Sequence, residues 1–587
     1  MNHVQRNNSG VKLSDYLVEY IHHAVAPVVF GYQGSSVCHL IDSIHTHPGM
    51  TFVESRHEQG AAFAANAYAQ LRHSAGIALG CSGPGAINLV AGIANAFFDS
   101  VPCLFLCGQV STRELRTDER MRQFGFQETD IVSIVKPITK YAVQIRDPQQ
   151  IAYERERADS LRRAGRPDPV LLDIPHDIQR SNVDVARLQH YAQVPQEDSS
   201  PAEADLEALE ASFNSSKRPV IVLGGGCAEL NRQPEWKQYL AGLNVPVVVS
   251  YRGRDIWTNG DPNYGGVIGA YGNRSANWAV YHSDALLCIG TRLDGRQTGG
   301  DLAAFAPGAQ KFVVDIDPVE LDSKECCSVG IRSDVIAFLR MVATRDRLRS
   351  HDGRWASTVD AWCARMPASA DYRLPGINPN AFMERMGRIG GDGAIFTTDV
   401  GQNQIGTNSS LFMGRGSRLL QSCGLGSMGY ALPAAVGAGF AAPGHPIVCF
   451  SGDGGFQMNV QELQTIRLHD LPVKAFVFNN RSLGLIRIYQ QKAMGGRVPG
   501  SVTGFGSPEY EALAKAYGFE YARVAEEIND ELLAAILNDP NPVLVEVCVS
   551  DQSTCCPEPT YMRSVENQSP LLSAEDIEEM RKDVNRI

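Results

Sequence analysis

Hydrophobic residues are arranged along the chain in short runs that alternate with longer segments of mixed polarity. The runs at 26–32, 76–83 and 101–108 have the length and apolar content of buried strands. The segments between them, such as 57–71 and 85–98, have the pattern of helices. This alternation of strand and helix predicts α/β domains built on parallel sheets.

Two polar breaks, at 192–207 and 364–379, divide the 587 residues into three parts. Each part begins a new series of strands and helices, and about 100–200 residues per domain is usual. We therefore expect domains at 1–190, 200–350 and 375–560, followed by a tail at 561–587. In the tail, Ser573 is a predicted helix N-cap ahead of an acidic first turn. An acidic polar face favours packing on the protein over binding to a membrane surface.

Composition narrows the function classes. Hydrophobic residues make up 44% and charged residues 20%, which is ordinary for a soluble globular protein. The net charge of −12 argues against a general nucleic-acid binder. No apolar run reaches the roughly 20 residues of a membrane span, and the N-terminus lacks the apolar core of a signal peptide. The 14 cysteines include no C-x-x-C motif, so a reduced, cytoplasmic setting is expected.

The segment 446–480 carries the strongest candidate chemistry. An apolar strand at 446–450 leads into Gly452-Asp453-Gly454-Gly455, a helix is predicted at about 456–469, and a second strand at 473–478 ends in Asn479-Asn480. The glycines allow a bulky ligand to approach the backbone, and the free N–H groups of a helix start suit a phosphate.

Asp453 and Asn480 are 27 positions apart, each at the carboxyl end of a predicted strand. In a parallel sheet such ends lie side by side. A carboxylate and an amide oxygen suit Mg²⁺, which fills its octahedron with phosphate and water. The pattern predicts a metal-bridged diphosphate site. A glycine-rich turn beside an unrelated Asn-Asn loop is the alternative.

This segment resembles the thiamine diphosphate signature of the acetohydroxyacid synthase and pyruvate decarboxylase superfamily. Further stretches from about 29 to 490 resemble acetolactate synthases, among them 29–42, 56–70, 82–102, 125–141 and 424–438. The resemblance implies a pyrimidine-binding, a central and a diphosphate-binding domain in that order. It also implies that active sites form where two subunits meet, in a homodimer or homotetramer.

The resemblance assigns roles to single residues. Glu58 matches the glutamate that shares a proton with the aminopyrimidine ring, and the alternative is a helix cap. Met428 matches the residue that bends the cofactor, and the alternative is a core gap-filler. Gln127 matches a glutamine beside the reacting carbon. The implied thiamine diphosphate contacts are Glu58, Val400, Gly401, Gln402, Asn403, Gly426, Met428, Gly452, Asp453, Gly454, Gly455, Asn480, Ser482, Leu483, Gly484 and Leu485, with Asp453, Asn480 and Ser482 at the metal.

The central part begins VIVLGGG at 220–226, which alone is a weak dinucleotide signal because it lacks G-x-G-x-x-G. The resemblance implies bound FAD without net redox chemistry. An emptied domain of similar fold is the alternative. The implied FAD contacts are Arg166, Gly224, Gly225, Gly226, Gly269, Gly272, Gly290, Thr291, Arg292, Asp294, Arg296, Asp315, Ile316 and Asp334.

Departures from the family pattern cluster where the acceptor substrate would lie. Ser35 replaces a glycine, His176 replaces a lysine, Tyr489 replaces a tryptophan, and Leu485 replaces a methionine. Ser35, Gln127, Leu485 and Tyr489 are therefore candidate substrate contacts, and Ser35 joins Glu58 and Gln127 as a catalytic candidate.

The stretches 31–44 and 122–142 resemble synthase relatives that build branched, yersiniose-type sugars. The leading hypothesis is a carboligase that decarboxylates a 2-keto acid such as pyruvate and adds the acyl unit to a ketone or nucleotide-linked keto-sugar. Acetolactate formation is the close alternative. A flavin-dependent keto-acid oxidase and a non-catalytic nucleotide-binding protein are the others.

Overall fold

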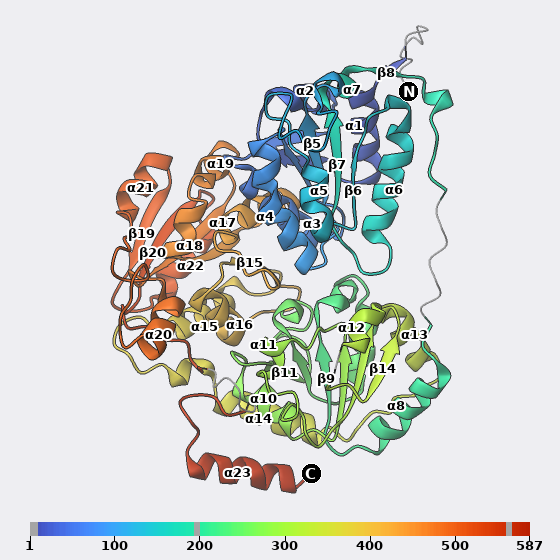
Figure 1. Cartoon of the computed structure of the whole chain (residues 1–587). Helices are drawn as coiled ribbons and strands as arrows, with labels where there is room; N and C mark the ends of the chain where they lie inside the picture. Colours follow the sequence, from blue (N-terminus) through green and yellow to red (C-terminus); the bar gives the residue numbers. More distant parts are fainter. Residues whose placement is uncertain (1–9, 193–199, 324, 559–565) are drawn as a thin grey trace.

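The computed structural model describes residues 10–192, 200–323, 325–558 and 566–587 (Figure 1). It contains three six-stranded parallel sheets, each with helices on both faces. The first domain is blue to teal in Figure 1, the central domain green, and the third domain tan to orange. The predicted α/β architecture is confirmed.

The first sheet has the order β3-β2-β4-β5-β7-β6. Its strands are β2 (Val28–Gly31), β3 (Thr51–Glu54), β4 (Ile77–Gly80), β5 (Leu104–Gln109), β6 (Tyr141–Gln144) and β7 (Val170–Pro175). Its helices are α1 (Leu13–Ala24), α2 (Cys38–Thr46), α3 (Glu58–Arg72), α4 (Pro84–Phe98), α5 (Ile131–Val135), α6 (Ile151–Arg163) and α7 (His176–Arg180), and β1 (Val11–Lys12) pairs with β8 (Asn182–Val183).

The third sheet repeats that topology, with the order β16-β15-β17-β18-β20-β19. Its strands are β15 (Ile395–Thr398), β16 (Arg418–Gln421), β17 (Ile447–Gly452), β18 (Val473–Asn479), β19 (Glu520–Val524) and β20 (Val543–Cys548). Its helices are α15 (Pro379–Gly390), α16 (Gln402–Ser410), α17 (Ala431–Ala441), α18 (Asp453–Met458), α19 (Glu462–Leu468), α20 (Gly484–Ala493), α21 (Tyr510–Tyr517) and α22 (Asp530–Asn538).

The central sheet has the order β11-β10-β9-β12-β13-β14, the doubly wound arrangement that binds dinucleotides where the strand order reverses. Its strands are β9 (Pro219–Leu223), β10 (Val247–Val249), β11 (Tyr264–Val267), β12 (Ala285–Ile289), β13 (Gln310–Asp315) and β14 (Val329–Arg332). The helices here are α8 (Glu203–Ser215), α9 (Pro234–Gly242), α10 (Arg274–Tyr281), α11 (Gly295–Thr298), α12 (Pro318–Asp322), α13 (Val335–Thr344) and the connecting α14 (Arg354–Arg365).

The first and third domains pack closely through α3 and α17. A Cβ at Gly437 would lie 2.0 Å from the carbonyl oxygen of Ala64, so only glycine allows this approach. Buried polar contacts fix the register: the Tyr430 hydroxyl donates to Asn66 (2.9 Å), and the Arg56 N–H donates to Glu462 (2.9 Å). These two domains therefore form one firmly packed body.

Two details concern the sequence predictions. The helix expected at about 456–469 is divided into α18 and α19, because Asn459, which accepts from the Glu462 N–H, lies between them with non-helical φ and ψ angles. In the tail, α23 (Ala574–Asn585) has the predicted cap, since Ser573 accepts from the Asp576 N–H. Met580 is fully buried on this helix, which packs on the protein as expected. No described helix is long and apolar enough to cross a membrane.

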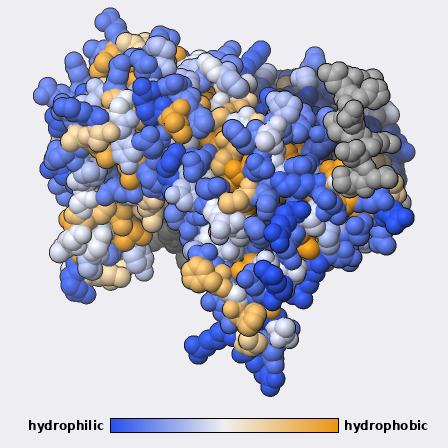
Figure 2. Space-filling view, turned by 90° about the horizontal axis from the view of Figure 1, so that it is seen from above, coloured by the Kyte–Doolittle hydropathy of each residue, from blue (hydrophilic) through white to orange (hydrophobic). Residues whose placement is uncertain are grey.

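Figure 2 shows the face seen from above in Figure 1. It is mostly hydrophilic, and the apolar residues that reach the surface are gathered in several patches between the polar ones. Buried apolar residues form the sheet cores, with one cluster shared by the first and third domains and separate clusters in the central domain.

Candidate active site

A cavity of about 280 Å³ lies in the third domain, at the carboxyl ends of β15, β17 and β18. Parallel sheets bind ligands at this edge. Every residue predicted to contact thiamine diphosphate lines the cavity, with Glu58 as the one exception. The residues that the sequence placed together are therefore brought together by the fold.

Asp453 is the first residue of α18 and is only 2% exposed. Its carboxylate accepts from the N–H groups of Gly454 (2.9 Å) and Ser482 (3.2 Å) and from the Ser507 hydroxyl (3.3 Å). Burial raises the pKa of Asp453 to about 6, and the N–H donors oppose that shift. A buried carboxylate without a cation is costly, so this site suits a metal ion.

The side chain of Asn480 is held so that its amide oxygen faces Ser482, another residue predicted to bind the metal. Its Nδ2 donates to Gln402 (2.9 Å) and to Ser553 (3.0 Å), which leaves Oδ1 to accept from the Ser482 N–H (3.1 Å). Since β17 and β18 are paired in parallel, with Gly452 opposite Phe478, Asp453 and Asn480 lie at neighbouring strand ends. The described residues contain no cluster of three His, Cys, Asp or Glu that could hold a metal by themselves. A metal here would need amide, backbone and phosphate oxygens as well.

Glycines leave room for a ligand in this cavity. A Cβ at Gly454 would lie 2.3 Å from Leu483 Cδ2, and a Cβ at Gly484 would lie 2.3 Å from Gln402 Oε1. Neither position accepts a side chain without displacing a cavity wall. The open glycine surface, the N-terminus of α18 and the buried oxygens fit a diphosphate with its metal.

Several residues of this site were not predicted from the sequence. Asp399 accepts from Ser451 and from the N–H groups of Gly429 and Tyr430, which fixes the start of α17 against β17. Burial raises the pKa of Asp399 to about 6. Asp399 lies behind the cavity wall, next to Val400, whereas the segment 553–556 lines the cavity itself. The position of Asp399 directly after a strand was a usable signal, whereas 553–556 carries no motif.

The three catalytic candidates gather at another place, around the turn 81–85 at the end of β4. A Cβ at Gly85 would lie 2.9 Å from Glu58 Oε1, and one at Gly83 would lie 2.9 Å from Gln127 Cβ. The loop of Ser35 packs on the same turn, since the Ser82 N–H donates to Ser36 (2.8 Å). Gln127 has a φ of 66°, a strained conformation that is found at functional sites.

Glu58 begins α3 and is 7% exposed. Its Oε2 accepts from Asn88 (3.0 Å), while no described residue donates to Oε1. Within one chain, this first-domain half-site does not line the third-domain cavity. Of the remaining substrate candidates, Leu485 lines the cavity and Tyr489 lies on the same helix with 62% of its surface exposed.

A second cavity, of about 410 Å³, lies at the carboxyl ends of β9, β12 and β13, where the central strand order reverses. It is lined by most of the predicted FAD residues: Arg166, Gly225, Gly226, Gly290, Thr291, Arg292, Asp294, Arg296, Asp315, Ile316 and Asp334. Gly224, Gly269 and Gly272 do not line it. They allow backbone segments to approach behind it, since a Cβ at Gly224 would lie 2.1 Å from the Gly290 carbonyl oxygen.

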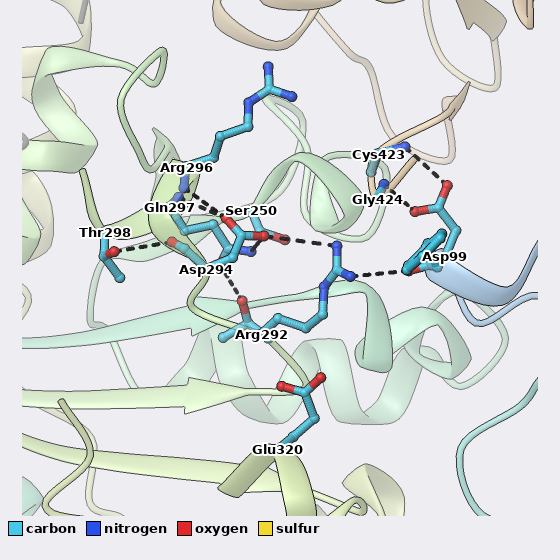
Figure 3. A network of polar contacts seen from close by, with 12 residues as sticks. Asp99, Ser250, Arg292, Asp294, Arg296, Gln297, Thr298, Glu320, Cys423 and Gly424 are labelled. Atoms are coloured by element: carbon cyan, nitrogen blue, oxygen red, sulfur yellow. Dashed lines mark hydrogen bonds and ion pairs between the residues drawn. The ribbon is translucent and has the colours of Figure 1, made fainter. Parts of the chain in front are cut away.

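The central cavity is rich in charge (Figure 3). Arg292 forms an ion pair with Asp294 (3.9 Å), and Asp294 caps α11 by accepting from the Arg296 and Gln297 N–H groups. Arg296 lies over the rings of Tyr251 and Tyr271. Burial raises the pKa of Asp315 above its ordinary value of 3.8. Guanidinium groups of this kind suit a dinucleotide diphosphate.

Comparison with known proteins covers all three domains. The sequence models for the N-terminal TPP binding domain, the central domain and the C-terminal TPP binding domain of thiamine pyrophosphate enzymes match residues 11–134, 206–342 and 399–547. The chain belongs to the thiamine pyrophosphate enzyme family. Thiamine pyrophosphate is another name for thiamine diphosphate.

Sequence similarity to relatives in this family covers most of the chain. It is 33% identical to the acetolactate synthase large subunit of Cyanidium caldarium over 90% of this chain and 92% of that protein. It is 33% identical to the acetolactate synthase isozyme 2 large subunit of Escherichia coli, over 90% and 94%. For the chloroplastic acetolactate synthase 2 of Zea mays the identity is 34%, over 94% and 87%. The protein is thus a thiamine diphosphate-dependent enzyme that forms C–C bonds.

Proposed function

We propose that this thiamine diphosphate enzyme decarboxylates a 2-keto acid, with pyruvate as the donor, and transfers the acyl unit to a carbonyl acceptor other than a second pyruvate. A ketone, such as a nucleotide-linked keto-sugar, is the proposed acceptor. The observation that carries the proposal is a contrast between two sets of positions. The glycines and the predicted metal-binding residues of the cofactor cavity match the family pattern, while Ser35, His176, Leu485 and Tyr489 depart from it on the acceptor side.

The proposed roles combine what the family resemblance implies with the positions of these residues. Asp453, Asn480 and Ser482 would hold Mg²⁺ on the diphosphate, and Met428 would bend the cofactor so that its two rings meet. When bound, thiamine diphosphate supplies the carbon nucleophile and holds the electrons left after carbon dioxide departs. Among the described residues, none donates a hydrogen bond to Glu58 Oε1, and Glu58 would exchange a proton with the aminopyrimidine ring of the cofactor. The Gly426 carbonyl would accept a hydrogen bond from the amino group of that ring.

Gln127 and Ser35 flank the same turn as Glu58, so they are the proposed contacts of the donor and acceptor. Ser35 adds a hydroxyl that can hydrogen-bond a polar acceptor. Leu485 and Tyr489 would line the acceptor path from the third domain. Because the smaller Tyr489 replaces a tryptophan of the family, this path would admit a bulkier acceptor.

A second copy of the chain is proposed to complete the site, because the Glu58 half-site and the diphosphate cavity are separate within one chain. Phe124 and Phe126, just before Gln127, are 62% and 86% exposed. Exposed aromatic residues beside a catalytic candidate are typical of a surface that another protein covers. A homodimer or homotetramer is therefore expected.

FAD is proposed for the central cavity, with a structural role. Its volume, the reversal of strand order and the arginine side chains support a dinucleotide. Purified protein should then be yellow with a flavin absorption band. Rapid reduction of a dye or quinone by pyruvate would instead support a keto-acid oxidase.

Acetolactate formation is the second candidate, favoured by the relatives named acetolactate synthase. The test is a product screen in which the protein, thiamine diphosphate and Mg²⁺ are incubated with pyruvate alone and then with added ketones. The proposal expects new ketone adducts and little acetolactate. Ser35→Gly and Tyr489→Trp restore family residues and should shift the products towards acetolactate. Acetolactate as the dominant product in every mixture favours the second candidate, and no carbon dioxide release from any 2-keto acid defeats both.

A further inference from the structure

The C-terminal end of α4 lies where the three domains meet. Phe98 and Asp99 belong to the first domain, Arg292 to the central domain, and the segment 422–424 to the third. Figure 3 shows Asp99 between Arg292 on one side and Cys423 and Gly424 on the other.

Asp99 holds the third-domain segment through its carboxylate. Oδ2 accepts from the Cys423 N–H (3.0 Å), and Oδ1 accepts from the Gly424 N–H (2.8 Å). One turn earlier on α4, Asn95 accepts from the Ser422 hydroxyl. Asp99 is 8% exposed, and burial raises its pKa while Arg252, the two N–H groups and Arg292 oppose that shift. Two charge-assisted bonds from successive N–H groups define the backbone direction at this point.

The same segment is closely packed and is fixed again five residues later. A Cβ at Gly424 would lie 2.7 Å from Phe98 Cβ and 2.8 Å from the Phe98 carbonyl oxygen, so the segment rests directly on the end of α4. At its other end, Asp399 accepts from the Gly429 N–H (2.9 Å). Gly426 and Met428, which line the thiamine diphosphate cavity, lie between these two carboxylate anchors.

The other face of the junction is a wall of the central cavity. Phe98, Asp99, Ser100 and Cys423 all line that cavity, and Arg292 donates to the Phe98 carbonyl (3.3 Å). A ligand in the central cavity would therefore contact the residues that anchor the segment 422–428. Only two residues separate Cys423, which faces one cavity, from Gly426, which faces the other.

We infer that Asp99 is a positioning residue that couples the two cavities, so that a dinucleotide in the central domain tightens the binding of thiamine diphosphate in the third. The inference rests on the proposed function. An occupant of the central cavity restricts the segment 422–428 through Asp99. Thiamine diphosphate then binds a segment that is already ordered, and the binding of each ligand favours the other.

The test measures thiamine diphosphate affinity with saturating Mg²⁺ in the full-length, cofactor-stripped chain, with and without saturating FAD. In the wild type, FAD should increase the affinity by about 5- to 150-fold, the usual range of such coupling. We call this ratio of affinities the coupling factor. In Asp99→Asn the coupling factor should fall close to one. An amide oxygen can accept from one N–H, but the amide nitrogen then faces the second donor.

A second variant disturbs the same contact from the opposite side. Gly424→Ala places a methyl group against Phe98 without altering any charge, and it should lower the coupling factor as well. The control is Asp315→Asn, a change at a residue that lines the central cavity but is not one of the proposed anchors of the segment 422–428. Whatever its effect on FAD binding, this variant should keep the wild-type factor once FAD is saturating. Circular dichroism confirms that each variant is folded.

The inference is overturned if folded Asp99→Asn and Gly424→Ala both keep the wild-type factor. It is also overturned if the wild type binds thiamine diphosphate equally well with and without FAD, a result that leaves the proposed function intact. A wild type that binds no thiamine diphosphate with Mg²⁺ under either condition would defeat the proposed function itself.

Discussion

The two cavities differ in the charge of the side chains that line them. Among the described residues, no arginine or lysine lines the third-domain cavity, where Asp453 is the one charged residue. The central cavity is lined by Arg163, Arg166, Arg252, Arg292 and Arg296, together with an equal number of acidic residues. Both occupy the carboxyl edge of a parallel sheet, so the difference is in the side chains and not in the fold.

This contrast indicates how each cavity can hold a diphosphate. A diphosphate next to a buried carboxylate is repelled unless a divalent cation lies between them, so the third-domain cavity requires a metal. Guanidinium groups can neutralise a diphosphate directly, so the central cavity does not. Ligand binding in the third-domain cavity should then depend on metal and pH. Ligand binding in the central cavity should depend on its arginine residues.

The largest expected effect separates cofactor activation from cofactor binding. Glu58→Gln keeps the shape of the first-domain half-site and its contact with Asn88, but it removes the group proposed to exchange a proton. Turnover should fall by about 10²- to 10⁴-fold. Binding of both cofactors, measured by equilibrium dialysis, should change little. Full turnover in Glu58→Gln would contradict the assigned role. The matched control is Glu54→Gln, on the preceding strand β3, which should keep normal turnover.

Removing the metal-binding carboxylate comes next. Asp453→Asn should weaken Mg²⁺-dependent binding of thiamine diphosphate by at least about 100-fold, because partners outside the coordination sphere already contribute about 10- to 100-fold to metal affinity. In the absence of thiamine diphosphate, FAD affinity should be the same in the variant and the wild type, with and without EDTA. A loss of FAD affinity caused by EDTA under this condition would show that the contrast between the cavities is wrong.

The contrast also explains what the sequence could predict. The GDGG–NN pattern predicts a carboxylate and an amide at the ends of two strands, and the parallel pairing of β17 and β18 brings those ends together. The central cavity has no comparable motif, so its arginine residues were reached only through family resemblance. Asp99 and the segment 553–556 were missed because their roles depend on domain packing, which no local pattern records. The break between α18 and α19 was missed for the same reason, because Asn459 donates to both Gly429 and Gln59 from distant segments.

The pH dependence of the two cavities should differ. In the metal-free chain the pKa of Asp453 is raised to about 6, and only its ionised form can bind Mg²⁺. Between pH 7 and pH 5 the metal affinity should therefore fall about tenfold, since the ionised fraction falls by that factor. Mn²⁺ binding without thiamine diphosphate measures this and avoids ionisation of the diphosphate. FAD affinity, measured without thiamine diphosphate, should not fall over the same range, because arginine stays charged and protonation of Asp315, whose pKa burial raises, only reduces the negative charge around the cavity.

The smallest effect tests the arginine side of the contrast. Arg296 is exposed and lies over Tyr251 and Tyr271, with centroid distances of 5.1 and 5.6 Å, so its charge is partly screened by solvent. Arg296→Gln should weaken FAD binding by about 1 kcal/mol, a factor of about five, as expected for an exposed charge. Added salt should reduce the difference between variant and wild type, since screening already weakens this interaction. Thiamine diphosphate affinity at saturating FAD should be unchanged, because Arg296 is not one of the residues proposed to anchor the segment 422–428. Flavin fluorescence titrations at two salt concentrations measure both effects, and a loss that is independent of salt would indicate a packing role for Arg296.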